Sequence, residues 1–557
     1  MPAAIPQRRR LILDSCVLGV VGALAAQAFT LLLRFTSWLF LGEVAHYAPP
    51  IAPNEGGTLE EVVGRFGLWL VPVSTTLGGL VVGLIIEKLA PEAEGHGTGT
   101  VVQAFHRTEG ELRDRVGPVK LIASALTIGS GGSAGREGPV ALMTAGFAST
   151  YARLTGRSAA SRRQLLLIGA AAGLAAIFRS PVGTALFAIE VLYSDMEFET
   201  GVLLYTMLAS IVAYAVNGLF AGYDPLFQVP GNIALTGPLD AAEYVLLGVG
   251  AGVLGAVLPS LFYYTRDAFR ALPIRTFLKP ALGGLAVGLL ALAVPQVIGG
   301  GYGWMQLAID GRLAVPLLLV LVLAKMVGLS LTVGSGGSGG VFAPTLYVGA
   351  MFGAALAHGL HQPAAPFAVV GMAAVFAGAA HVPIATLMMV TEMTGGYTLL
   401  VPAALAVMLS YLVQTRLVAG RRYRSLYESQ VPSRADSPAH HAEHLAIALR
   451  ILKEHGPDVP GLNRSDLLPL LRLGVPVDLE GGRRLMIGVV KADTSFAGRI
   501  IEGEEGALGD GTRVVAILRG EHMMVPRAGT QLAAGDRVLL LTTPASAQEL
   551  AGQLDAW

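Results

Sequence analysis

Cysteine and charge are both scarce in this chain. Its 557 residues include one cysteine, Cys16, so an internal disulfide and a cysteine-based metal site are excluded. The 39 basic and 39 acidic side chains give a formal net charge of zero, which indicates no nucleic-acid partner. The sequence also lacks an HExxH metal motif and a Walker motif. GGSAG at 131–135 fits the GxSxG pattern of hydrolases only superficially, because it belongs to a duplicated element. We therefore expect neither an enzyme nor a bound metal or cofactor.

The few charges are distributed very unevenly. No Asp, Glu, Lys or Arg occurs from Met326 to Thr391, and further uncharged runs lie at 15–33, 66–86, 201–223, 244–265, 280–309 and 393–415. Several reach the roughly 20 apolar residues that a helix needs to cross a bilayer. The shorter runs 138–152 and 164–178 are expected to be helices that stop within the membrane. The sequence predicts an all-α polytopic membrane protein with interrupted helices.

Arginines flank the predicted membrane part at both ends. Arg8, Arg9 and Arg10 precede the first apolar run, and Arg416, Arg421, Arg422 and Arg424 follow the last one. Positive charge next to spans marks the cytoplasmic side, so both termini are predicted to be cytoplasmic.

The composition changes near residue 420, where charged residues return. We expect a membrane domain over 1–430, a linker over 431–474 with a helix at Leu445 to His455, and a small cytoplasmic α+β domain over 475–557. Four short runs in this last part read as strands: LMIGVVKAD, TRVVAILRG, HMMVPRAG and DRVLLLTT. Ser495 to Glu502 and Ala545 to Leu554 are predicted to be short helices.

A glycine-rich signature occurs twice in the membrane part. Thr127 to Gly135 reads TIGSGGSAG, and Thr332 to Gly340 reads TVGSGGSGG. PVGTALFAIE, ending at Glu190, likewise returns as PIATLMMVTE, ending at Glu392. We place the two repeats at about 68–225 and 277–419. Only the first copy continues with a carboxylate, Glu137, which marks it as the working site.

The duplicated stretches have the features of an anion site. Each ends in a proline, Pro139 or Pro344, which is tolerated in the first turn of a helix. Helix N-termini carry unpaired N–H groups and a partial positive charge. Several such ends meeting inside a membrane bind an anion without holding it as tightly as a lysine would. Close helix packing through small residues is the alternative, but it does not explain a duplicated nine-residue pattern followed by proline.

These residues resemble the CLC family of chloride channels and proton/chloride exchangers over residues 15–430. Gly135 to Pro139 matches its GREGP motif, and Gly340 to Pro344 its GxFxP motif. SLYESQV around Tyr427 is similar to the segment that carries the pore tyrosine, and Gly95 to Gly99 occupies the place of GSGIP. The resemblance implies two inverted repeats, a homodimer in the bilayer and one anion path per subunit. It also implies chloride as the substrate and an anion-binding set of His96, Gly138, Val341, Phe342 and Tyr427.

In this resemblance Glu137 is the gate, whose carboxylate blocks the path when ionised and moves aside when protonated or displaced. Such a charge is costly at the bilayer centre unless it is paired or neutralised. A structural glutamate that caps Arg136 is the alternative.

Two positions depart from the family pattern. His96 stands where the family usually has serine, and we expect it either to line the anion site or to point away, which leaves a chloride or nitrate preference open. Val191 stands where many exchangers carry the internal proton glutamate. A proton crossing beside Val191 would need water or another carboxylate, and the nearby candidates include Glu190 and Asp195. The possible proton path is assigned to Glu137 and Glu190, although the repeat partner Glu392 favours a structural role for Glu190. A passive channel is the alternative to an exchanger, and a cation transporter is a remote one.

Residues 475–557 are similar to the TrkA-C (RCK-C) domain of potassium-conductance regulators. The matching features are SFAGRIIE, VVAILRG, Pro526 and the run from Thr530 to Leu540. The resemblance implies regulation through dimerisation or through a small ligand such as a cyclic dinucleotide. It also favours the inner membrane of a bacterium as the location.

Overall fold

The structure is a computed structural model. It describes residues 7–229 and 238–440 and, in the C-terminal part, 445, 448–450, 471, 476–479, 482–502, 507–508, 511–520 and 522–555. The chain divides into two compact units, Met1–Pro432 and Ser433–Trp557, which are described separately. The predicted helix at Leu445 to His455 lies mostly outside the described residues.

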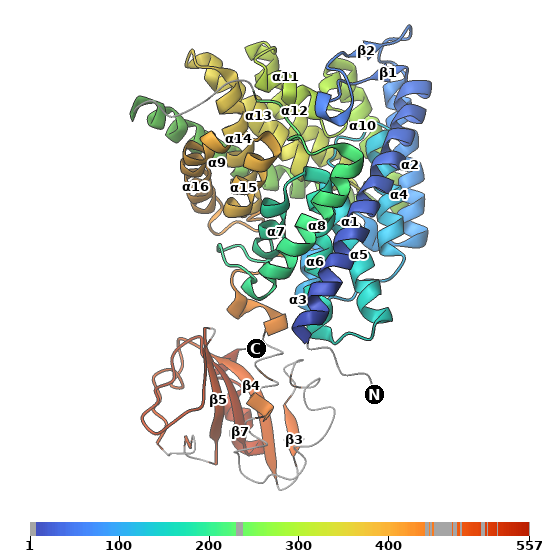
Figure 1. The fold of residues 1–557 in the computed structure, drawn as a ribbon. Helices are drawn as coiled ribbons and strands as arrows, with labels where there is room; N and C mark the ends of the chain where they lie inside the picture. Colours follow the sequence, from blue (N-terminus) through green and yellow to red (C-terminus); the bar gives the residue numbers. More distant parts are fainter. Residues whose placement is uncertain are drawn as a thin grey trace. The chain divides into compact units, whose positions relative to one another are not determined.

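The first unit is helical (Figure 1). Its helices before the second repeat are α1 (Gln7–Ser37), α2 (Val71–Leu89), α3 (Thr98–Arg107), α4 (Val116–Gly129), α5 (Glu137–Leu154), α6 (Ala159–Phe178), α7 (Pro181–Glu190), α8 (Leu203–Ala221) and α9 (Pro238–Ala271). The second repeat contains α10 (Lys279–Ala293), α11 (Tyr302–Ile309), α12 (Val315–Gly334), α13 (Phe342–Gly359), α14 (Ala364–Ala380), α15 (Pro383–Thr394) and α16 (Leu400–Val418).

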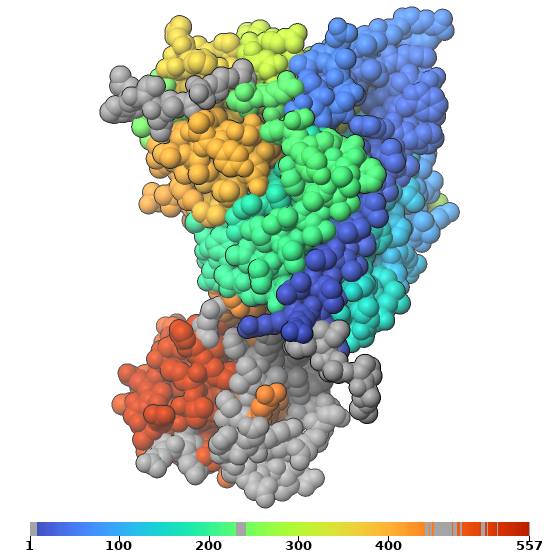
Figure 2. All heavy atoms as spheres, viewed as in Figure 1, coloured from blue at the N-terminus to red at the C-terminus, as the bar shows by residue number. Residues whose placement is uncertain are grey.

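Eight helical segments in the described residues are long and apolar enough to cross a membrane. Both α1 and α8 expose large apolar side chains, among them Leu24, Leu31, Leu204 and Leu219. Figure 2 shows these two helices next to each other on one face of the unit. Outward-facing leucines suit contact with lipid, as expected for a multi-pass membrane protein.

The first helix runs from one face of this unit to the opposite face. Residues 7–10 begin α1 on one face, the N-terminal face, and the chain leaves its far end through a π-helical turn, Trp38–Val44, into a small hairpin. In this hairpin β1 (Tyr47–Ala48) pairs antiparallel with β2 (Val62–Val63). The hairpin therefore lies on the opposite face, called here the hairpin face (Figure 1).

The two repeats are related by an approximate two-fold axis. The equivalent glycines Gly135 and Gly340 exchange backbone hydrogen bonds of 2.8 and 2.6 Å. The hydroxyls of Thr127 and Thr332 each accept a bond from the backbone of the other copy, at Ser338 and Ser133. Equivalent residues bond reciprocally in this way only when the two copies are related by a two-fold rotation.

Uncharged runs do not give the helix ends reliably. The run 164–178 belongs to α6, which begins at Ala159 and takes in Arg162 and Arg163, so our prediction of a short helix there was wrong. The run 280–309 contains two helices, α10 and α11, separated by glycines. A buried arginine lengthens a helix beyond its apolar stretch, and a glycine turn divides a stretch that has no charge.

The second unit contains an antiparallel sheet. Its strands are β3 (Val477–Leu479), β4 (Arg483–Val490), β5 (Arg513–Arg519), β6 (His522–Met524), β7 (Arg537–Thr542) and β8 (Leu554–Asp555). Their order is β3-β4-β7-β5-β6, with β8 also paired to β4. The four strand predictions are confirmed. The last predicted helix forms as α19 (Pro544–Leu550), where the Thr543 hydroxyl caps the N-terminus.

The helix that we predicted at Ser495 to Glu502 does not form. Residues 495–498 form turns, and Gly498 has φ of +90°, outside the helical region. The amides of Gly498 and Ile501 donate to Leu532 and Thr530 at 2.7 and 2.9 Å. The backbone of this segment therefore bonds to a neighbouring segment, which overrides its local helix preference.

Candidate anion path

Two helices begin side by side in the interior of the first unit. α5 starts at Glu137 and α13 starts at Phe342, each directly after a glycine-rich stretch. Pro139 and Pro344 both lie in the first turn, as predicted, where a proline costs no hydrogen bond. The Gly135–Gly340 bonds join the two starts, so their free N–H groups and partial positive charges lie close together.

The carboxylate of Glu137 lies at this meeting point. The residue is only 1% exposed, and the Tyr302 hydroxyl, from the first turn of α11, donates to Oε1. A Cβ at Gly135 would lie 2.2 Å from Glu137 Oε2 and 3.1 Å from the amide nitrogen of Ala343 in α13. The carboxylate therefore faces the start of α13 and not lipid. The ion pair of Arg136 is with Glu55 and not with Glu137.

Tyr302 is a residue of this site that our sequence analysis missed. Its segment GGGYG, Gly299 to Gly303, is the repeat counterpart of GHGTG, Gly95 to Gly99. In both segments the glycines at the first and third positions have positive φ: 63° and 80° in the second copy, and 74° and 85° in the first. This comparison was available from the sequence and would have singled out the segment that carries Tyr302, although not its contact with Glu137.

His96 and Tyr427 lie together, and the His96 backbone is next to the first turn of α5. Their ring centroids are 5.4 Å apart, and Tyr427 is 1% exposed. The His96 Nδ1 accepts a 3.3 Å bond from the Gly99 amide, which leaves Nε2 for another partner. A Cβ at Gly138 would come within 2.0 Å of the His96 carbonyl oxygen. Glycine at 138 thus lets the GHGTG turn approach the first turn of α5.

Phe342 joins the two groups. Its ring lies 4.4 Å from Phe178 and 4.2 Å from Phe376, while Phe187 contacts both Phe342 and Tyr427. Val341 and Phe342 are themselves buried, at 2% and 3% exposure. The structure therefore brings together Glu137, Gly138, Val341, Phe342, Tyr427 and His96, with aromatic rings around the helix starts.

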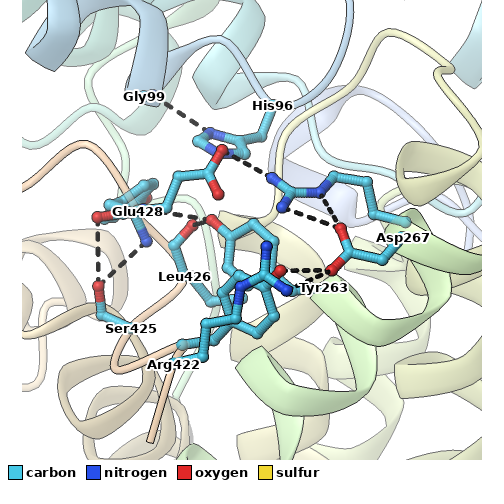
Figure 3. Close-up of polar contacts among 11 residues, drawn as sticks. His96, Gly99, Tyr263, Asp267, Arg422, Ser425, Leu426 and Glu428 are labelled. Carbon is cyan, nitrogen blue, oxygen red and sulfur yellow. Dashed lines mark hydrogen bonds and ion pairs between the residues drawn. The ribbon is translucent and has the colours of Figure 1, made fainter. Parts of the chain in front are cut away.

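The segment that carries Tyr427 is held firmly by α9. The Tyr263 hydroxyl donates to the Leu426 carbonyl at 2.6 Å and accepts from the Glu428 amide at 3.2 Å (Figure 3). The Arg266 guanidinium pairs with the Glu428 carboxylate at 2.6 Å. Ser425 accepts from the Tyr427 amide at 3.2 Å. These bonds fix the backbone on both sides of the tyrosine.

Glu190 caps a helix other than α5 and α13. Its carboxylate accepts bonds of 3.1 and 2.6 Å from the amides of Ile384 and Ala385, at the start of α15. Glu392, in α15, accepts reciprocally from Val182 and Gly183 at the start of α7, at 3.2 and 2.8 Å. This arrangement suits the structural alternative for Glu190. Val191 is buried and supplies no titratable group.

Two fully buried lysines, which we had not singled out, support the turns of the path. Lys120 Nζ donates to the carbonyls of Ala93 and Gly95 at 2.9 and 2.6 Å. Its counterpart Lys325 donates to Val297 and Gly299 at the same distances. Each ammonium thus satisfies the carbonyls next to a glycine turn, at the turns that precede His96 and Tyr302.

Comparison with known proteins agrees with this geometry. Residues 78–415 match the family described as voltage gated chloride channel, and residues 485–555 match the TrkA-C domain. Relatives named voltage-gated ClC-type chloride channel ClcB, from Escherichia coli O9:H4 (strain HS) and Shigella flexneri, are 31% identical over 432 residues, which cover 74% of this chain and 98% of the relative.

Solved structures share the fold of the first unit. A CLC-type fluoride/proton antiporter superimposes with a TM-score of 0.64 at 23% identity, covering 77% of this chain and 99% of its own. A slow cyanobacterial Cl⁻/H⁺ antiporter gives 0.65 at 20% identity, covering 76% and 97%. The family consists of channels and transporters and not of enzymes. This chain therefore belongs to the CLC family of voltage gated chloride channels, and it is a multi-pass membrane protein with a C-terminal TrkA-C domain.

Proposed function

We propose that this protein carries chloride, or a similar small anion, across a membrane along a path gated by Glu137. The observation that carries the proposal is the buried Glu137 carboxylate, which lies between the Tyr302 hydroxyl and the start of α13. A carboxylate at this position has the charge of the anion and uses the same donors. It therefore occupies a binding site that a chloride ion would fill.

The gate works because the Glu137 carboxylate and the anion compete for this binding site. An ionised Glu137 is held by the hydroxyl and by the partial charge of the helix ends. Protonation removes its negative charge, and the neutral side chain then leaves the donors to an anion. The amides of Val341 and Phe342, the Gly138 backbone and the Tyr427 hydroxyl line the remainder of the path toward the N-terminal face.

Chloride transport coupled to protons is the leading form of this function. Antiporters are among the solved structures of the same fold, and Glu137 supplies one proton-binding group. Glu190 is a weaker candidate for the path, because two amides already use its carboxylate. The alternative is a passive chloride channel, favoured by Val191 and by the names of the curated relatives.

One vesicle experiment separates the two forms. Protein is reconstituted into liposomes with a chloride gradient and no proton gradient, and internal pH is followed with a dye. An exchanger moves protons uphill, and valinomycin with potassium prevents a voltage from building up. Chloride flux without proton movement would establish the channel, and flux of cations without anions would overturn the proposal.

His96 is proposed to line the path on the N-terminal side of Glu137. Its ring packs against Tyr427 and its Nε2 remains free for an anion when Nδ1 accepts from Gly99. The variant His96→Ser should change the ratio of chloride to nitrate flux. An unchanged ratio and an unchanged pH profile would remove His96 from the anion-binding set.

The N-terminal face is proposed to be cytoplasmic, in the inner membrane of a bacterium. Asp14, near the start of α1, accepts from Arg157 and Tyr151 at 2.7 and 2.8 Å, which places the end of α5 on this face. Arginines are abundant there: Arg8, Arg9, Arg10, Arg153, Arg157, Arg162 and Arg163. Positive charge favours the cytoplasmic side. We also propose a homodimer and a small ligand, such as a cyclic dinucleotide, for the TrkA-C domain.

A further inference from the structure

A large cavity lies beyond the gate on the hairpin face. Its volume is about 960 Å³, and it is lined by α1, by the loop between β1 and β2, and by the segment around Tyr302. The loop is anchored, because Tyr47 donates to Glu61 at 2.9 Å, and burial together with Glu61 raises the pKa of this phenol so that it stays protonated. The cavity is thus a formed space beside the gate.

Its charged lining is mostly basic. Three arginines, Arg34, Arg136 and Arg179, face two acidic residues, Glu55 and Asp224. Arg34 donates to the Glu55 carbonyl at 2.9 Å, and Arg179 donates to the carbonyls of Asp224 and Asn54 at 2.8 Å each. Among the described residues neither of these two arginines forms an ion pair. Their charge therefore remains to attract an anion.

Arg136 connects the cavity to the gate. Its guanidinium pairs with the Glu55 carboxylate, and the two side chains are only 13% and 15% exposed. Arg136 Nε is buried and has no hydrogen-bond partner among the described residues. The guanidinium lies 4.6 Å above the ring of Tyr302, whose hydroxyl holds Glu137. A negative group on Arg136 is thus separated from the gate by one aromatic ring.

We propose that this cavity is a second anion-binding site outside the Glu137 gate, and that the Glu55 carboxylate occupies it until an anion displaces it from Arg136. The ligand is a small monovalent anion, because displacement frees one guanidinium while Arg34 and Arg179 stay bonded to carbonyls. Only the onward passage of this ion through the gate rests on the proposed function; binding in the cavity does not.

Thiol labelling tests the site without any measurement of flux. In a Cys16→Ser background, Ile51→Cys places a thiol on the exposed rim of the cavity, and Val62→Cys places one on the same hairpin outside it. For each variant, the reaction rate of an anionic methanethiosulfonate is divided by that of a cationic one. This ratio should be at least about tenfold higher at Ile51→Cys than at Val62→Cys. Chloride should slow the anionic reagent at Ile51→Cys only, and gluconate should not. Equal rates for both reagents at both positions, with no chloride effect, would overturn the proposal.

Removal of the competing carboxylate gives a second test. Glu55→Gln should lower the half-saturating chloride concentration on the hairpin face about three- to tenfold and leave that on the N-terminal face unchanged. Glu60→Gln removes an equal charge from an exposed position on the same loop and should match the wild type. Equal values for the two variants would refute the role of Glu55. Chloride protection of Ile51→Cys in a protein that carries no chloride would instead support the site and refute the proposed function.

Discussion

Replacing Tyr302 with phenylalanine removes one hydroxyl from the gate. The ring stays, so its contact with Arg136 at 4.6 Å and its stacking on Phe227 at 5.9 Å are retained. A hydrogen bond to a charged group contributes about 1.5–3 kcal/mol when it is buried. The ionised gate of Tyr302→Phe loses this stabilisation, whereas the protonated gate loses less.

The size of the effect follows from that difference. One pH unit corresponds to about 1.36 kcal/mol, so the pH of half-maximal chloride flux should rise by about one to two units. This pH rises, because a carboxylate that has lost a donor takes up its proton at a higher pH and then leaves the anion-binding site. Flux at neutral pH should increase accordingly.

Chloride efflux from proteoliposomes, measured between pH 4 and 8 with a chloride electrode, gives this profile. Tyr347→Phe is a suitable control, because it removes a buried hydroxyl bonded to the Gln296 carbonyl at 3.3 Å and not to the gate. A profile of Tyr302→Phe that coincides with wild type, or that moves to lower pH, would refute the role of this hydroxyl.

Three further substitutions test the frame around the gate. Gly138→Ala would place a Cβ within 2.0 Å of the His96 carbonyl oxygen, so we expect loss of flux and a destabilisation of about 1–3 kcal/mol. Gly201→Ala is the control, because Gly201 has open space around it. This control should behave as wild type in flux and thermal unfolding assays. Glu190→Gln and Glu392→Gln each weaken bonds to two helix-start amides, so both should lower the unfolding temperature in detergent, by an amount equivalent to about 1.5–3 kcal/mol for Glu190→Gln. The decrease should be larger for Glu392→Gln, because Glu392 also accepts from the Ser180 hydroxyl. If Glu190→Gln abolished proton coupling at an unchanged unfolding temperature, Glu190 would belong to the proton path and not to the frame.

Local sequence signals predicted the helix starts of the path well. Proline and glycine act on the backbone of their own segment. GREGP and its counterpart therefore indicated that new helices begin near Glu137 and Phe342. The duplication gave the pairing of the two stretches, and the reciprocal bonds of Gly135 and Gly340 show that a two-fold axis relates them. The strands β4, β5 and β7 were predicted for the same reason, because each has a continuous apolar run.

Features that depend on contacts between distant segments could not be predicted. Tyr302 meets Glu137 only when the second repeat folds against the first, and Glu55 meets Arg136 only through the loop between β1 and β2. The predicted helix at Ser495 to Glu502 failed for a similar reason, because its amides bond to the segment around Leu532. A pattern within one segment does not contain these contacts.

Proton coupling and chloride flux in Glu137→Gln, measured together in one vesicle preparation, test the central claim most directly. A glutamine has the shape of the gate but cannot ionise, so it cannot compete with chloride as a charge or carry a proton. We predict chloride flux that persists, loses its dependence on pH and moves no protons uphill. A variant that retained proton coupling, or the pH dependence of the wild type, would contradict the assignment of Glu137 as the gate.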